Sequence, residues 1–256
     1  MRSIMDYDEF SMFRENAEEV GLAWRGTPVV ERRALAVGDG QRLSALVWGE
    51  GEAELVLVHG GAQNAHTWDT VALALDRPLV AIDMPGHGHS SWRDDRNYGP
   101  ASTADALALA IEAVAPRARL VVGMSMGGLS ALILASQHPE LVERLLLVDV
   151  TPGVDHAKAK AVIDFVRGPE YFESFDAILE RTIAHNPTRS RSSLRRGVLH
   201  NAKALSDGRW TWRYDRRLFR DPKGMEISHA EGGAEQTPGA EQTPGADARV
   251  EFTSLW

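Results

Sequence analysis

Short apolar runs alternate with helical stretches between residues 27 and 153. Such runs are typical of parallel strands that are buried on both faces of a sheet. We expect strands over Val29–Val37, Arg42–Trp48, Glu54–His59, Pro78–Asp83, Arg119–Gly123 and Leu141–Val150. We expect helices over residues 8–24, Thr67–Leu75, Ala101–Ala115 and Met126–Gln137. This alternation predicts the α/β class, with a doubly wound and mostly parallel sheet.

The pattern changes after this region, so four parts are expected. Residues 1–26 form an N-terminal helical segment and residues 27–153 the α/β core. Residues 154–220 have helical spacing with no strand among them, which predicts a helical cap. In residues 221–256, Ala234–Gly239 is repeated as Ala240–Gly245. This last part has too few large apolar residues to offset its ordering entropy, so we expect it to be disordered.

The pentapeptide Gly123-Met124-Ser125-Met126-Gly127 lies between a predicted strand and a predicted helix. The G-x-S-x-G pattern is a weak signal alone, but in this setting it predicts a nucleophile elbow. A nucleophilic serine needs a base, a carboxylate that orients the base, and two backbone N–H donors for the oxyanion. We expect the donors to be Met126 and Gly61, with Ala62 as the alternative to Gly61.

Other motifs accompany the pentapeptide in a fixed order. They are His59-Gly60-Gly61, Asp83-Met84-Pro85-Gly86-His87-Gly88-His89-Ser90 and Leu147-Val148-Asp149. Together with Gly123–Gly128 they resemble the α/β-hydrolase superfamily, and more closely its capped serine esterase and C–C-bond hydrolase branches. The resemblance covers residues 27 to about 220. It implies an eight-stranded sheet, a helical cap after strand six, and a Ser/acid/His triad.

The same resemblance suggests the chemistry. A serine at position 125 departs from the dehalogenases and epoxide hydrolases, which attack with a carboxylate. A small ester, thioester, lactone or activated C–C bond is the expected substrate, cleaved through an acyl-enzyme on Ser125, and the cofactor-free haloperoxidases stay open. A truncated non-catalytic relic or a ligand-binding module is the alternative.

The sequence predicts the nucleophile elbow more clearly than the acid and the base of the triad. Nothing after Arg220 has the pattern of the last two strands, so these are expected to be missing from this chain. Asp149, after strand six, is the candidate acid, although a loop-capping role is equally compatible. The base stays unknown, because none of the nine histidines lies where the family keeps it. His59, His87 and His89 are instead expected to order backbone.

Loss of the last strands would leave the run Leu145–Val148 as an uncovered edge. Exposed edges pair with other chains, so self-association through strand six is expected.

The composition of the chain limits which partners, cofactors and cellular locations are expected. The net charge of −8 argues against nucleic-acid binding, although residues 181–220 carry eleven Lys/Arg against two Asp. That basic stretch is either a face paired with acids or an attractor of anionic substrates. The chain has no cysteine, which excludes disulfides and fits the cytoplasm. No apolar run predicts a membrane span, and no spacing predicts a metal or cofactor. A small-molecule substrate is the expected partner.

Overall fold

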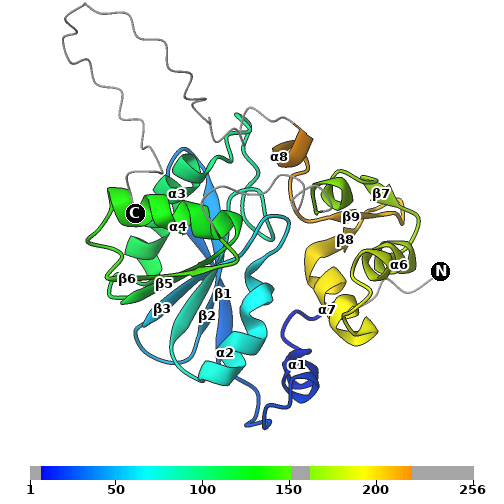
Figure 1. Ribbon diagram of the computed structural model, residues 1–256, viewed down its shortest axis with the longest axis horizontal. Coiled ribbons are helices and arrows are strands. Elements are labelled where there is room, and N and C mark those ends of the chain that lie inside the picture. The colour runs from blue at the N-terminus through cyan, green and yellow to red at the C-terminus, as the bar shows by residue number, and fades with distance from the viewer. Residues whose placement is uncertain (1–6, 151–161, 221–256) are drawn as a thin grey trace, which may run out of the picture.

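The computed structural model describes residues 7–150 and 162–220 (Figure 1). The predicted disordered tail and the predicted absence of two final strands concern residues outside these ranges. Two of the histidines, His156 and His229, lie outside them too.

The main sheet confirms the predicted α/β class. Its strands are β1 (Val30–Ala36), β2 (Arg42–Trp48), β3 (Leu55–Val58), β4 (Leu79–Asp83), β5 (Leu120–Met124) and β6 (Arg144–Val148). They lie in the order β1-β2-β4-β3-β5-β6. β4, β3, β5 and β6 are parallel, whereas β2 is antiparallel to both β1 and β4. The carboxyl ends of the parallel strands therefore meet at one edge, where ligands bind in open α/β sheets.

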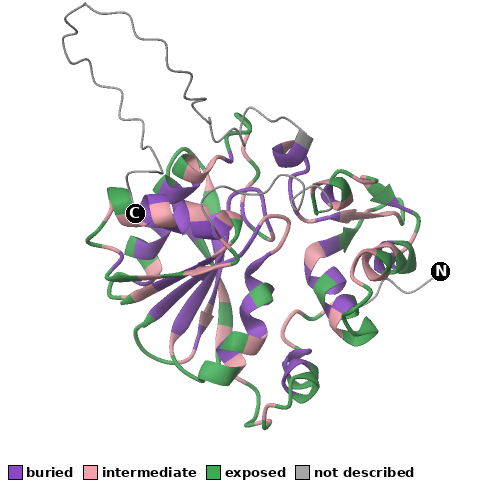
Figure 2. Ribbon diagram, in the orientation of Figure 1, coloured by how far each residue is buried: buried purple, intermediate pink, exposed green. Residues whose placement is uncertain are grey.

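Helices cover both faces of this sheet because alternate residues of its strands are apolar on both sides. Val56 and Val58 of β3 face α3 (Pro100–Val114) and α4 (Met126–Gln137) in one apolar core. Leu55 and Leu57 face the other core, with α1 (Phe13–Glu19), η1 (Ala65–Trp68) and α2 (Asp69–Leu75). Figure 2 shows the central strands buried between the helices. The sheet is therefore doubly wound.

The expectation that residues 155–220 contain no strand is wrong. This region has α6 (Phe175–His185), α7 (Arg191–Asn201) and the one-turn α8 (Arg217–Arg220). It also has a small antiparallel sheet of order β7-β9-β8, formed by Tyr171–Phe172, Trp210–Trp212 and Ala202–Ala204. Strands of two or three residues are too short to leave a period in the sequence, which is why the pattern missed them.

The region after β6 has its own apolar cluster, which includes Phe172, Trp212 and Tyr214. Met126, on the main sheet's side, contacts both this cluster and the core of α3 and α4. The two parts therefore pack against each other beside the start of α4.

In the described part of the chain, five of the eleven basic side chains in residues 181–220 pair with acids: Arg191, Arg196, Arg209, Arg216 and Arg217. Arg196 is almost fully buried, and its guanidinium binds Asn16 Oδ1 at 2.6 Å and Glu15 Oε1 at 2.8 Å on α1. Arg191 pairs with Glu180 at 2.7 Å. These contacts favour the interpretation of a paired face over that of an attractor of anions, and they attach α1 to α7.

β6 is the edge strand of the main sheet in the described part of the chain, and Leu146 on it is 51% exposed. The self-association expected at this edge stays a prediction. Among the described residues, no helix has both the length and the apolar character needed to cross a bilayer.

Candidate active site

Ser125 occupies a sharp turn between β5 and α4. Its backbone has φ 49° and ψ −119°, a conformation that favours glycine and costs a side chain on the order of 1–3 kcal/mol. Two hydrogen bonds hold the turn: Ser125 N–H donates to Val148 O at 2.9 Å, and Leu129 N–H donates to Ser125 O at 3.0 Å. Ser125 is exposed, so its hydroxyl is accessible above the sheet edge. This is the local geometry that a nucleophile elbow requires.

The flanking glycines are required because backbone approaches them closely. A Cβ on Gly127 would overlap the carbonyl oxygen of His59 and lie 2.9 Å from that of Val58. A Cβ on Gly123 would lie 2.7 Å from Gly127 O. The first turn of α4 thus packs directly onto the end of β3, which brings the loop after β3 next to Ser125.

That loop carries the predicted oxyanion donors. A Cβ on Gly60 would lie 3.3 Å from the Cβ of Ser125, and one on Gly61 would lie 3.7 Å from the sulfur of Met126. The N–H of Ala62, the alternative donor, is occupied, because it donates to His87 Nε2 at 3.1 Å. This favours Gly61 over Ala62. Met126 is the first residue of α4, where N–H groups lack partners inside the helix. The oxyanion role of Gly61 and Met126 stays a prediction.

His59 and His87 order backbone, as expected. His59 Nδ1–H donates to Gly60 O at 2.7 Å, and its Nε2 accepts from Met84 N–H at 3.0 Å. His87 Nδ1–H donates to Pro85 O at 2.9 Å. Complete burial lowers the pKa of both rings, that of His87 to about 3. Each ring is therefore neutral, and it joins the loops after β3 and β4 rather than moving a proton.

Asp149 follows β6 directly and is exposed, with φ 54°. Its neighbour Val148 accepts the hydrogen bond from Ser125 N–H, so the end of β6 lies beside the elbow. The carboxylate role of Asp149 stays a prediction.

The general base stays unassigned. His59 and His87 use their ring nitrogens on backbone, and His185 stacks on Phe165 at 4.3 Å. His138 ends α4, about 18 Å along that helix from Ser125. No histidine among the described residues hydrogen-bonds to the Ser125 hydroxyl.

His66, Asp69 and His200 form a buried cluster that no pattern in the sequence predicted. The two imidazoles stack with centroids 3.7 Å apart and planes at 16°. His66 Nδ1 lies 2.9 Å from Asp69 Oδ2, and its Nε2 lies 3.1 Å from Glu9 Oε2. Burial lowers the pKa of His66, but the charge of Asp69 and the hydrogen bonds to Asp69 and Glu9 outweigh it and raise the pKa to about 9.

This shift makes stability depend on pH. Because the folded state holds the His66 proton more tightly than the unfolded state, the gain is complete below pH 6.5 and lost as pH rises through about 9. We expect the wild-type free energy of unfolding to fall by on the order of 3 kcal/mol over this window. His66→Gln should make the free energy of unfolding less dependent on pH, whereas His138→Gln, at the half-buried end of α4, should leave the dependence unchanged. Urea unfolding with EDTA at a series of pH values measures the slope, and equal slopes in all three proteins would refute the assignment.

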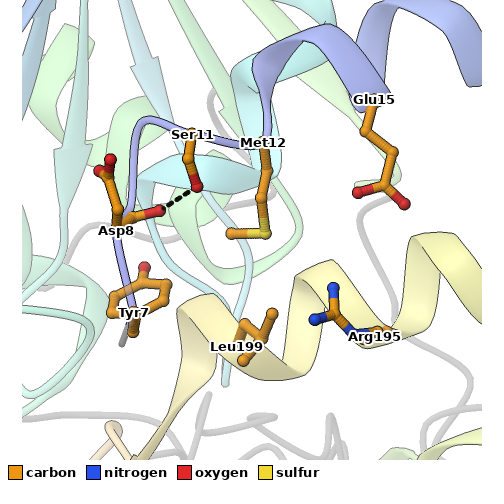
Figure 3. A pocket seen from close by; sticks show the side chains of 7 residues that line it. All are labelled: Tyr7, Asp8, Ser11, Met12, Glu15, Arg195 and Leu199. Carbon is orange, nitrogen blue, oxygen red and sulfur yellow. Dashed lines mark hydrogen bonds between the residues drawn. The ribbon is translucent and has the colours of Figure 1, made fainter. Parts of the chain in front are cut away.

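A groove of about 390 Å³ lies between residues 7–15 and α7 (Figure 3), and Ser125 is not among the residues that line it. Tyr7, Met12 and Leu199 are among the residues that line it.

Comparison with known proteins gives the lineage. A family model described as alpha/beta hydrolase fold matches residues 54–242. The chain is 46% identical over 225 residues to the esterase Rv0045c of Mycobacterium tuberculosis, which is 85% of this chain and 74% of the relative. A solved structure of that M. tuberculosis esterase superposes on this chain with a TM-score of 0.75 at 44% sequence identity. The match covers 84% of this chain and 74% of the chain in that structure. A pimeloyl-acyl-carrier-protein methyl ester esterase of Klebsiella pneumoniae is 39% identical over 106 residues, which cover 41% of this chain and 39% of that protein.

Three observations point to the same family: the serine on a strand-to-helix turn, the doubly wound sheet and the match to the family model. This chain belongs to the α/β-hydrolase fold family and is a hydrolase by lineage.

Proposed function

We propose that this chain is a serine hydrolase that cleaves a small ester, thioester, lactone or activated C–C bond through an acyl-enzyme on Ser125. One observation carries the proposal: Ser125 is exposed on a strained turn at the N-terminus of α4, beside the Gly60-Gly61 loop. The relative that matches 85% of the chain is named as an esterase, which favours the ester within this set.

The proposed reaction begins with attack of Ser125 Oγ on the substrate carbonyl. The oxyanion that forms would accept hydrogen bonds from the N–H groups of Gly61 and Met126, and the positive end of the α4 dipole would favour its charge. Loss of the alcohol leaves an acyl-serine, which water then cleaves. Asp149 is the proposed acid that orients the base, and no histidine is assigned as the base itself.

The surroundings of the site favour a small apolar acyl group. The Phe219 ring lies over the loop, so that a Cβ on Gly61 would be 3.4 Å from its Cζ. Phe219, Ala62 and Met126 all belong to, or pack against, the apolar cluster of the region after β6. An apolar wall next to two backbone donors suits a neutral small molecule rather than a nucleic acid or a membrane surface. A cytoplasmic location stays a prediction.

The alternative function is a non-catalytic ligand-binding module. The absence of a histidine bound to Ser125 in the described residues favours it. Ester hydrolysis separates the two functions. We expect the purified chain to hydrolyse a short p-nitrophenyl ester faster than the buffer and faster than the same protein after heat denaturation. Equal rates before and after denaturation would favour the binding module.

A further inference from the structure

The buried histidine cluster joins three parts of the chain that are far apart in sequence. His66 is on η1 and Asp69 begins α2, both on the main sheet's side. His200 is on α7, in the region after β6. Tyr7 and Glu9, which contact the two rings, precede α1. Figure 1 shows α1, α2 and α7 meeting at this place. Nothing in the proposed esterase chemistry uses these side chains.

One nitrogen of the cluster has no partner. His200 is 5% exposed, and its Nε2 is buried without a hydrogen bond. Asp69 Oδ2 lies 3.8 Å from this nitrogen, beyond hydrogen-bond range. A buried polar atom without a partner is costly and needs an explanation. Here the atom points to a carboxylate that is already bound to a second imidazole.

The ring nitrogens that face away from Asp69, His66 Nε2 and His200 Nδ1, each have a hydrogen-bond partner. These partners would hold the two rings in place for metal binding. Glu9 accepts the Nε2–H of His66, at 3.1 Å. The Tyr7 hydroxyl lies 2.7 Å from His200 Nδ1 and can accept its proton. Asp69 accepts the proton on His66 Nδ1, and once that proton leaves, the lone pairs of His66 Nδ1 and His200 Nε2 both face Asp69. Metal-ligating histidines are held in this way, with the second ring nitrogen bound to a carboxylate or another oxygen.

The charges around the cluster suit a cation. Arg32 is offset by ion pairs with Glu9 at 2.6 Å and Asp83 at 2.8 Å. Asp69 is almost fully buried, and the ion pairs it forms among the described residues are with the two histidines. Asp69 is the negative charge that a bound cation would meet. Burial raises the pKa of Asp69, and the charges of His66 and Arg32 oppose that rise.

We propose that His66 Nδ1, the Asp69 carboxylate and His200 Nε2 form a binding site for a borderline transition-metal ion such as Zn²⁺. Their ligand atoms all lie within 4.8 Å of one another. Two imidazole nitrogens and a carboxylate oxygen are ligands that Zn²⁺ prefers, with bonds of about 2.0–2.2 Å. Closure needs the more widely separated ligand atoms to come closer together and one ring to rotate out of the stack. The ion replaces the proton on His66 Nδ1, which passes to solvent.

Such an ion would attach the N-terminal segment and α7 to the main sheet. It would lie away from Ser125, so its effect would be on the packing of the region after β6 against the core rather than on acyl transfer. The groove of Figure 3 is lined by Tyr7 and by Leu199, the neighbour of His200, so it opens beside the site.

Zinc titration of the full chain tests the site. Chelator-treated wild-type protein should bind one Zn²⁺ per chain in isothermal titration calorimetry and unfold at a higher temperature when loaded. His200→Gln should lose at least about tenfold in affinity. His138→Gln, which changes a half-buried histidine beside the carboxylate of Glu140, should bind Zn²⁺ as wild type does. Equal binding by wild type and His200→Gln, or no binding by wild type, would overturn the proposal.

A second variant covers the case in which His200→Gln does not fold. Tyr7→Phe keeps the ring against His200, at 5.8 Å between centroids, and removes only the hydroxyl. We expect about tenfold weaker zinc binding, because the partner that holds His200 Nδ1 is lost. Calorimetry in two buffers of different ionisation enthalpy should also show release of about one proton per ion. Unchanged affinity in Tyr7→Phe together with no proton release would reject the site.

Discussion

Ser125→Ala is expected to abolish ester hydrolysis. The substitution removes the hydroxyl that forms the acyl-enzyme and leaves the predicted oxyanion donors in place. Loss of the nucleophile in serine hydrolases costs on the order of 10³-fold or more in turnover, and the residual rate comes from the oxyanion donors and binding. Initial rates with a short p-nitrophenyl ester, on wild type and variant of equal purity, measure the loss.

Ser130→Ala is the matched control. Ser130 lies on the same helix and is fully buried, and its hydroxyl donates to Met126 O at 3.1 Å. Its removal costs one local hydrogen bond of about 1 kcal/mol and leaves the elbow intact. We expect this variant to keep its turnover. Turnover of Ser125→Ala equal to that of wild type would remove Ser125 from the mechanism.

Gly127→Ala is expected to destabilise the protein by about 3 kcal/mol, at the upper end for overpacking, since its methyl group would overlap backbone. The overlap is with His59 O, and Val58 O is 2.9 Å away. Neither carbonyl can move without separating α4 from β3. At a solvent-facing helix position the same substitution has the opposite effect on stability, because alanine is favoured there over glycine by about 1 kcal/mol. The free energy of unfolding in urea measures the change.

Gly197 of α7 offers the comparison position, because a Cβ there would have nothing within 4 Å. Gly197→Ala should therefore stabilise the chain by up to about 1 kcal/mol. Comparison of the two variants separates the stability cost of close backbone packing from the stability gain due to helix propensity. A Gly127→Ala variant as stable as wild type would show that α4 does not pack on β3 as described.

The parts that could be predicted from the sequence are those fixed by local pattern. The helix Met126–Gln137 begins and ends at the predicted residues, because a glycine-rich turn precedes it and His138-Pro139 follows it. The strand Arg42–Trp48 is also as predicted. The leading helix is shorter than expected, at Phe13–Glu19, since Gly21 with φ 73° lies where the predicted pattern continues.

The parts that could not be predicted depend on contacts between distant residues. The strands at Tyr171–Phe172 and Trp210–Trp212 exist because they pair with each other, and neither has a periodic pattern of its own. His66 and His200 come together only when α7 packs on η1, so their spacing carried no signal. The expected choice of Gly61 over Ala62 as oxyanion donor acquires a structural reason only from the hydrogen bond between Ala62 N–H and His87.

The central claim is that Ser125 is an activated nucleophile, and a fluorophosphonate probe tests it most directly. The folded chain is incubated with the probe and digested, and the modified residue is located by mass spectrometry. The account predicts one modification per chain, on Ser125, that disappears after denaturation and in Ser125→Ala. Folded protein that stays unlabelled, or carries the label on another serine, would contradict it.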